Sequence, residues 1–290
     1  MSTHSSQDEA ERASADGPST AASDAGPADG RARILILGGT TESRVLAAKL
    51  AERRDCAVTL SLAGRTAEPA PQPVPVRVGG FGGVEGLADY LAAEKIALLV
   101  DATHPFATRI SVNATAAADR VGVPLVAIRR PAWRAVAGDR WTEVESVEAA
   151  VAALGETPRR VFLALGRQEI TPFEAAPQHA YVVRSVDPVE PPLAVADATY
   201  LTARGPFDEA AEKALLAHHR IDAVVAKNSG GEASYGKIAA ARALGVEVIV
   251  VRRPSAPPGT VATVEAALEA VDHRLASRSA SATAAVARGE

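Results

Sequence analysis

The sequence lacks the features of a secreted, metal-binding or membrane protein. It contains one cysteine, Cys56, which excludes an internal disulfide and a cysteine-rich metal site. No apolar run approaches the length of a membrane-spanning helix, and the N-terminus has no apolar stretch like that of a signal peptide. We therefore expect a cytoplasmic protein that does not interact with membranes.

Aromatic residues and net charge are also scarce. Phe, Trp and Tyr make up 4% of the 290 residues, while alanine is abundant, so we expect an aliphatic, helix-rich core. A formal net charge of −4 argues against nucleic acid as the main partner. A chain of this length has room for two domains.

The two ends of the chain lack the residues that build a core. Residues 1–32 contain no Ile, Leu, Val, Phe, Tyr or Trp and consist mostly of Ser, Ala, Asp, Gly and Pro. Such a segment cannot bury enough apolar surface to offset its ordering entropy, so we predict a disordered tail. The similar composition of residues 276–290 predicts a flexible tail.

Between the tails, apolar runs typical of buried strands alternate with helical patterns. In the first half, strands are predicted at 33–37, 57–62, 96–101 and 124–129, and helices at 42–53, 84–94 and 107–121. In the second half, strands are predicted at 160–165, 180–185, 198–203, 221–226 and 246–251, and helices at 146–154, 207–219, 235–244 and 261–275. This alternation predicts an α/β fold of two tandem Rossmann-like domains with parallel sheets. We expect a dinucleotide-binding domain at 33–130 and a substrate-side domain at 146–275, joined by a polar stretch.

The first predicted strand runs directly into a glycine-rich turn. Gly38 and Gly39 follow the apolar residues 34–37, and a helical pattern begins a few residues later. Strand, glycine turn and helix present backbone N–H groups to a phosphate, and Thr40 and Thr41 add hydroxyl donors. The turn is not the G-x-G-x-x-G fingerprint, and a tight βα turn without a ligand has the same pattern.

The turn after the second predicted strand has a base where NAD-binding proteins have an acid. The acid binds the ribose 2′-hydroxyl of NAD, whereas a base accommodates the 2′-phosphate of NADP. Arg65 stands here, followed by Thr66. This favours NADPH, although a solvated loop arginine is the alternative. A second glycine-rich turn, 79–83 around Gly80, suits close approach to the cofactor or the neighbouring domain, or is a flexible connector.

Polar residues follow nearly every predicted strand at its carboxyl end, where open α/β sheets bind ligands. His104 could donate a proton, hydrogen-bond a ligand or bond locally at a helix start. Asp101 could instead hold its loop through an Asx-type turn. Cations at the loops of the second half suggest an anionic ligand, with surface solvation as the alternative for each. The candidate substrate-binding residues there are Arg204, Lys227, Asn228, Ser229 and Lys237.

Six segments of the chain, taken together, resemble the precorrin-6A reductase family of corrin-ring (cobalamin) biosynthesis. They are residues 38–44, 63–66, 79–83, 101–107, 203–207 and 227–231. The resemblance covers roughly residues 33–275. Ser43 is a departure, because a small Ala or Gly is expected there.

The resemblance implies hydride transfer from NADPH to one double bond of the macrocycle precorrin-6A, which gives precorrin-6B. It also implies that the substrate is a large ring edged by carboxylates, and a similar enzyme acts on the cobalt-containing ring. We expect no bound metal. The expected cofactor-binding residues are Gly38, Gly39, Thr40, Thr41, Glu42, Arg65, Thr66 and Gly80, and the expected catalytic residues are His104 and Asp101.

Two other functions remain open at this stage, a non-catalytic NADP-binding regulator and a nucleotide-sugar transferase. A regulator needs no cationic strand-end loops around the nicotinamide, and a transferase should bind its nucleotide sugar and ignore NADPH. Whether the ring carries cobalt, which residue gives the proton and whether the protein oligomerises also stay open.

Overall fold

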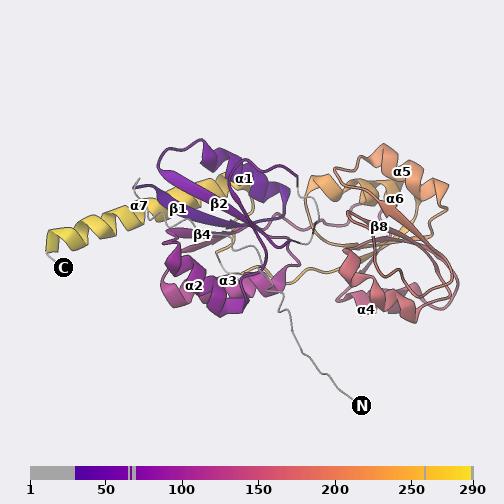
Figure 1. Ribbon diagram of the computed structural model, residues 1–290. Helices are drawn as coiled ribbons and strands as arrows, with labels where there is room; N and C mark the ends of the chain where they lie inside the picture. The colour runs from indigo at the N-terminus through magenta and orange to yellow at the C-terminus, as the bar shows by residue number, and fades with distance from the viewer. Residues whose placement is uncertain (1–29, 65, 67–69, 258, 289–290) are drawn as a thin grey trace, which may run out of the picture. The chain divides into compact units, whose positions relative to one another are not determined.

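The computed structural model describes residues 30–64, 66, 70–257 and 259–288 (Figure 1). Most of the predicted N-terminal tail, residues 1–29, therefore lies outside the described residues. The strands are β1 (Ala32–Leu37), β2 (Cys56–Leu62), β3 (Val76–Val78), β4 (Leu98–Asp101), β5 (Leu125–Ala127), β6 (Trp141–Val144), β7 (Arg160–Ala164), β8 (Ala180–Ser185), β9 (Ala198–Thr202), β10 (Ala223–Lys227) and β11 (Glu247–Val251). The helices are α1 (Thr41–Ala51), α2 (Gly83–Ala93), α3 (Thr108–Val121), α4 (Val147–Leu154), α5 (Glu209–His218), α6 (Gly236–Leu244) and α7 (Val264–Arg288), with short 3-10 turns at η1 (Arg167–Glu169), η2 (Thr171–Ala175) and η3 (Glu232–Ser234). None of the helices in these ranges combines the length and apolarity needed to cross a membrane.

The first sheet is parallel and has the strand order β3-β2-β1-β4-β5. Residues 34–37 of the central strand β1 are buried on both faces. Ile34 and Ile36 contribute to one core with residues of α1 and α7, and Leu35 and Leu37 to another with α2 and α3. This order is that of a mononucleotide-binding half, in which the direction of winding reverses between β1 and β4. Ligands bind where the loops after those two strands diverge.

The second sheet repeats this arrangement. Its order is β6-β11-β10-β7-β8-β9, and all its pairings are parallel. Without the edge strand β6, the order has the same form as in the first sheet, with β7 in the place of β1 and β10 in the place of β4. In the second sheet, the direction of winding therefore reverses between β7 and β10. The predicted α/β fold with two parallel sheets is confirmed.

Two edge strands were not predicted. β3 has three residues and exposes Val76 and Val78, and β6 lies within the stretch that we expected to be a polar connection. β6 pairs with β11 in the register Trp141↔Val248. Both strands are short and incompletely buried, so they lack the apolar run that identifies a central strand.

The last helix differs most from expectation. We expected a helix at 261–275 in the second half, followed by a flexible tail, whereas α7 continues to Arg288 and covers the first sheet. Val264, Ala267 and Val271 of α7 are buried in the core that contains Ile34 and Ile36. Figure 1 shows α7 beside the strands of the first sheet. The i, i+3, i+7 spacing of its apolar residues predicts a buried face but does not say which sheet covers it.

Candidate active site

The turn between β1 and α1 is shaped by its two glycines. A Cβ on Gly38 would lie 2.6 Å from Cδ1 of the buried Leu60, so a side chain does not fit at this position. Gly39 has a φ of +111°, and a Cβ built on it would meet no atom within 4 Å. The backbone at Gly39 therefore borders open space, in a conformation that L-residues rarely adopt. These features suit the close approach of a phosphate to the turn.

Thr40 caps α1 and also joins the turn to the end of β4. Its Oγ1 accepts a hydrogen bond from Ser43 N at 3.1 Å and donates one to Ala102 O at 2.8 Å. The N–H groups of Gly39 and Thr40 point to Ser43 Oγ, at 3.2 and 3.1 Å. Thr41 begins the helix and is exposed. The predicted phosphate-binding residues are thus brought together on one helix N-terminus.

The other predicted cofactor residues lie on two further turns. Arg65 is outside the described residues, and its neighbour Thr66 lines the cavity described below. Gly80 is exposed, and its carbonyl accepts a hydrogen bond from Arg77 at 2.7 Å. The Arg77 guanidinium lies 3.8 Å from the Phe81 ring centroid. Arg77 therefore holds the second glycine-rich turn in place.

Asp101 ends β4 and is buried. Its carboxylate accepts hydrogen bonds from Thr103 N at 3.1 Å and from Arg129 Nη2 at 2.5 Å. Arg129 also donates to Ser111 Oγ at 2.6 Å, and both Asp101 and Arg129 are less than 10% exposed. These contacts agree with the loop-holding alternative for Asp101. A carboxylate enclosed in this way is poorly placed to reach a ligand.

His104 is held as a neutral imidazole. Burial, followed by the nearby cations Arg130 and Lys227, lowers the pKa of His104 from 6.5 to about 3. Its Nδ1 accepts a hydrogen bond from Phe106 N at 3.3 Å, so we assign the ring proton to Nε2. His104 can therefore donate a hydrogen bond through Nε2–H, but it does not carry the extra proton of a general acid near pH 7.

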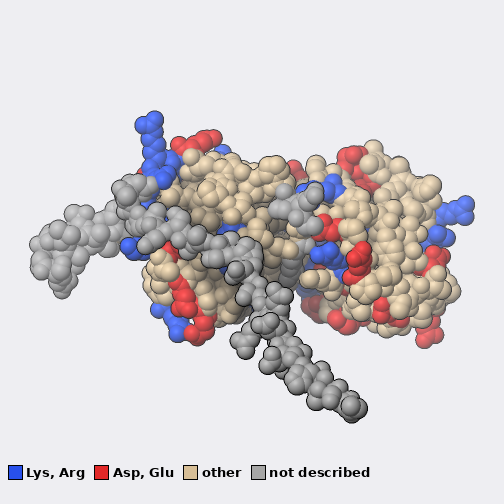
Figure 2. Space-filling view, in the orientation of Figure 1, with Lys and Arg blue, Asp and Glu red and all other residues tan. Residues whose placement is uncertain are grey.

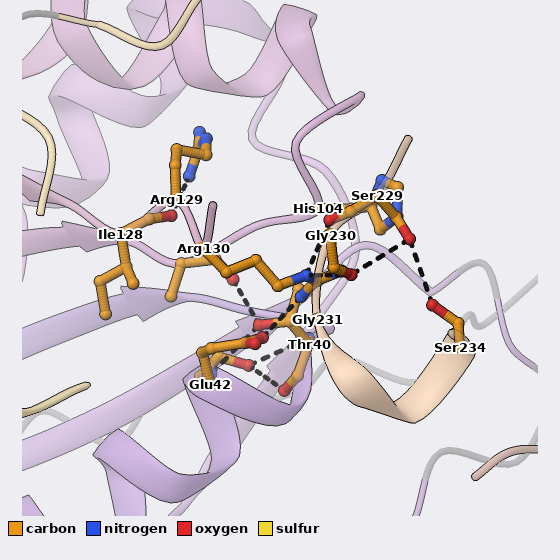
Figure 3. A network of polar contacts seen from close by, with 12 residues as sticks. Thr40, Glu42, His104, Ile128, Arg129, Arg130, Ser229, Gly230, Gly231 and Ser234 are labelled. Atoms are coloured by element: carbon orange, nitrogen blue, oxygen red, sulfur yellow. Dashed lines mark hydrogen bonds and ion pairs between the residues drawn. The ribbon is translucent and has the colours of Figure 1, made fainter. Parts of the chain in front are cut away.

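Arg130 joins the cofactor turn to the loop after β10 (Figure 3). Its Nη1 donates to Glu42 Oε2 at 2.7 Å, and its Nε lies 2.8 Å from the carbonyl oxygens of both Ser229 and Gly230. Glu42, a predicted cofactor residue, is thus directed at an arginine. Ser229, a predicted substrate residue, contributes its backbone to the same network.

Asn228 and Ser229 shape the loop after β10 through their side chains. Asn228 is 7% exposed, and its carboxamide accepts from Trp133 N at 2.8 Å and donates to Trp133 O at 3.0 Å. Ser229 Oγ lies 3.2 Å from Ser234 Oγ. The Asn228 amide is thus already paired on both sides, which gives it a structural role in the loop.

A cavity of about 290 Å³ opens at the carboxyl ends of β7, β8 and β9. Thr66 from the first half lines it together with Lys237 from the first turn of α6. Lys237 is 5% exposed, and its Nζ donates to Ser234 O and lies 5.0 Å from the Trp133 ring centroid. Burial, and secondarily Arg184, lowers the pKa of Lys237 to about 7. In its protonated form, this buried amine is suited to binding an anion that enters the cavity.

Two further cations of the second half, Arg184 and Lys227, have carboxylate partners. Arg184 forms a buried, two-pronged ion pair with Glu212, and its guanidinium lies 3.7 Å from the Phe207 ring centroid. Lys227, at the end of β10, pairs with Glu169, in the 3-10 turn η1 that follows β7. Arg204 follows β9 and is exposed, and the cavity is lined by its neighbour Ala203.

Sequence reasoning missed the partners that these cations use. Arg129 and Arg130 follow β5 in the sequence, but nothing local predicts Asp101 as the partner of Arg129 or Glu42 as that of Arg130. Figure 2 shows Lys, Arg, Asp and Glu interspersed on the face in view. The cations that distinguish the site are instead the buried Arg129, Arg184 and Lys237.

The protein has two parallel sheets of matching strand order, and the first has a capped glycine turn at the point where its direction of winding reverses. These features define a Rossmann-like nucleotide-binding protein with a second α/β unit. The model of the family "Precorrin-6x reductase CbiJ/CobK" matches residues 33–272. The chain belongs to this family of reductases, as the resemblance of its six segments indicated.

Individual relatives agree with this assignment. A precorrin-6A reductase from Sinorhizobium sp is 62% identical over 84% of this chain and 94% of the relative. One from Rhodobacter capsulatus is 52% identical over 80% of this chain and 93% of the relative. A solved structure of CobK precorrin-6A reductase is 48% identical, covers 84% of this chain and 97% of its own, and superposes with a TM-score of 0.80.

Proposed function

We propose that this protein reduces precorrin-6A to precorrin-6B with NADPH, a step of cobalamin biosynthesis. The observation that carries the proposal is that one chain combines a nucleotide-type turn on its first sheet with a cavity that contains a buried cation on its second. The family and its named relatives support a reductase. They do not favour the non-catalytic regulator or the sugar transferase.

The residues of the first sheet fit a dinucleotide. The pyrophosphate would lie against Gly39 and Thr40 at the N-terminus of α1, where the backbone of Gly39 borders open space. The N–H groups of Gly39 and Thr40, which donate to Ser43 Oγ in this structure, would have to exchange that partner for the phosphate. Arg65 and Thr66 would bind the 2′-phosphate, and Gly80 would allow close approach of the cofactor. NADPH supplies a hydride when bound; the chain positions it and excludes competing reactions.

The substrate would enter the cavity at the second sheet. Lys237 is the residue that we assign to a ring carboxylate, because its amine contacts a carbonyl and an aromatic ring rather than an acid. Lys227 already pairs with Glu169, so it would have to exchange this partner to bind a ring carboxylate. Arg204 would act at the rim, where it is exposed.

Reduction of a double bond adds a hydride to one atom and a proton to the other. His104 would not supply that proton as an imidazolium, because its pKa is about 3. We assign it instead to orienting a ligand through the Nε2–H group. Asp101 would act indirectly, by holding the loop that carries His104.

The metal-free ring is the substrate that we favour. The relatives named precorrin-6A reductase include those 62% and 52% identical to this chain, whereas a cobalt-precorrin-6A reductase from Synechocystis sp. is 31% identical. The cytoplasm stays a prediction from the sequence.

The test is a reduction assay with the purified chain. NADPH absorbance and the appearance of precorrin-6B are followed with precorrin-6A, with cobalt-precorrin-6A and without a ring, and each reaction is repeated with NADH. We expect NADPH consumption that matches precorrin-6B formation and requires the ring. NADPH binding without ring-dependent turnover would contradict the proposal and point to a regulator.

A further inference from the structure

The segment after β5, residues 130–133, and the loop after β10, residues 228–231, are joined by several hydrogen bonds. Trp133 exchanges two hydrogen bonds with the Asn228 side chain, and its indole Nε1 donates to Gly231 O at 3.0 Å. Arg130 adds the hydrogen bonds from its Nε to the carbonyls of Ser229 and Gly230. Residues 130–133 and 228–231 therefore behave as one unit.

The packing in this unit leaves no room for a side chain at Gly230 or Gly231. Gly230 has a φ of +63°, and a Cβ on it would lie 2.1 Å from Pro131 O. A Cβ on Gly231 would lie 2.7 Å from Arg130 Cδ. Arg253 fixes the other side by donating to Arg130 O at 2.8 Å. The Arg130 side chain thus packs against Gly231, and the Arg130 backbone is held by Arg253.

From that position, Arg130 also contacts the cofactor turn. Its partner Glu42 is in the first turn of α1, two residues after Thr40, where a carboxylate is favoured by the helix dipole. The loop on its other side begins directly after Lys227 and leads through η3 to Lys237. One planar guanidinium therefore touches the turn assigned to NADPH and the loop that leads to the substrate lysine (Figure 3).

We propose that Arg130 is a positioning residue that couples the binding of NADP(H) to the binding of the tetrapyrrole. The proposal rests on the function proposed above. A ligand that orders the α1 turn fixes Glu42, which fixes the guanidinium and with it the Ser229–Gly230 backbone. Binding of the ring then requires less ordering of the loop, and the effect is reciprocal. A lysine has no planar fork and cannot hold both turns at once.

The experiment measures the dissociation constant of NADP⁺ with and without saturating precorrin-6A. These two ligands cannot react with each other, because NADP⁺ has no hydride to transfer. For the wild type, we expect precorrin-6A to tighten NADP⁺ binding by about fivefold or more. For Arg130→Lys, each single-ligand constant should stay within about threefold of wild type, while the tightening falls to near onefold. Arg120→Lys, in the exposed pair with Glu85, is the matched control and should keep the full tightening.

A structural role alone would weaken both ligands and leave their ratio unchanged, so full tightening in Arg130→Lys would overturn the proposal. So would the absence of tightening in the wild type. If Arg130→Lys does not fold, Glu42→Gln decides the question, because it removes the ion pair and keeps the bonds from Arg130 to the loop; reduced tightening supports the coupling and full tightening rejects it. Failure of the proposed function would show separately, as no NADPH consumption by the wild type with precorrin-6A.

Discussion

At the scale of single residues, the buried amine of Lys237 gives the cavity a charge that changes with pH. Its pKa is about 7, so the amine is cationic below pH 7 and becomes neutral above it. We expect kcat/KM for precorrin-6A to fall as the pH rises through 7, because this ratio reports groups of the free enzyme. Lys237→Met should lower kcat/KM at pH 6 roughly 10- to 100-fold through the loss of a charge-assisted contact, and should remove this titration.

The measurement is a pH profile of kcat/KM for the wild type and for Lys237→Met, together with the NADPH affinity of each. NADPH binding should be the same in wild type and Lys237→Met. A profile that keeps its fall above pH 7 in the variant would assign the titration to another group.

His104 makes a second pH-dependent contribution, this time to stability. Its pKa is about 3 in the folded protein, against 6.5 ordinarily, so the unfolded chain binds a proton between these values that the folded one does not. The free energy of unfolding should therefore decrease as the pH falls from 6.5 toward 3, by at most about 1.4 kcal/mol per pH unit from this group. His104→Asn should give a shallower dependence.

Urea unfolding at pH 7 and pH 5 measures the difference. His273→Asn, at an exposed position of α7, is the matched control for the substitution itself. An unchanged difference between the two pH values in His104→Asn would show that this histidine is not held neutral.

Arg65 can be tested although it lies outside the described residues. If it binds the 2′-phosphate, Arg65→Ala should weaken NADPH by about 1.5–3 kcal/mol and leave NADH nearly unchanged. Dissociation constants from NADPH and NADH fluorescence titrations give the comparison. Equal weakening of both cofactors would place Arg65 away from the 2′-phosphate.

Residue roles were the least predictable part of the site. Asp101, Glu42 and Asn228 stand in polar strand-end segments, as expected, but their carboxylate or amide groups are paired with Arg129, Arg130 and Trp133. These partners lie 28, 88 and 95 residues away in the chain. A local pattern places a polar side chain at the end of a strand, but only the tertiary fold decides what it contacts.

At the scale of elements, the turn between β1 and α1 depends on a close fit against β2. A methyl group at Gly38 would meet Cδ1 of Leu60, which is itself fully buried and cannot move aside freely. Gly38→Ala should destabilise the protein by about 1–3 kcal/mol through overpacking, and should weaken NADPH as the turn is displaced. Denaturant unfolding and a cofactor titration check the two effects.

Gly80 is the control for Gly38, because it has room for a side chain. A methyl group there meets no atom within 4 Å, so Gly80→Ala should change stability by less than about 0.5 kcal/mol. Similar stability losses in Gly38→Ala and Gly80→Ala would show that contact with Leu60 is not the cause of the destabilisation in Gly38→Ala.

Elements with strong apolar runs could be predicted from the sequence within a few residues. β1, β8 and β11 are examples, because each is buried on both faces and contains consecutive branched aliphatics. β3 and β6 could not be predicted in this way, because an edge strand of three or four residues gains its structure from pairing with a neighbour. The matching strand order of the two sheets was also invisible, since no sequence repeat accompanies it.

At the scale of the whole molecule, the first core depends on the last helix. Val264 and Val271 of α7 are buried against residues of β1 and α1, and each contributes about 1.5–3 kcal/mol by burial. A chain that ends at Thr263 should lose at least about 3 kcal/mol of stability and its NADPH binding, although every residue assigned to the cofactor is kept. A chain that ends at Ser277 keeps both valines and is the control.

Thermal melting and an NADPH titration of the two shortened chains test this dependence. NADPH binding by the chain that ends at Thr263, at the affinity of the control, would mean that the first sheet is stable without α7.

The return of α7 to the first sheet also sets an order of events during synthesis. All five strands of that sheet have been made once Ala127 is reached, but the helix that covers β1 beside α1 is translated only after the complete second sheet. At roughly 10 residues per second, the first sheet waits on the order of ten seconds on the ribosome with one apolar face covered by α1 but not yet by α7. The half that contains the first sheet is therefore begun first and completed last, and the second half has to fold beside an unfinished neighbour.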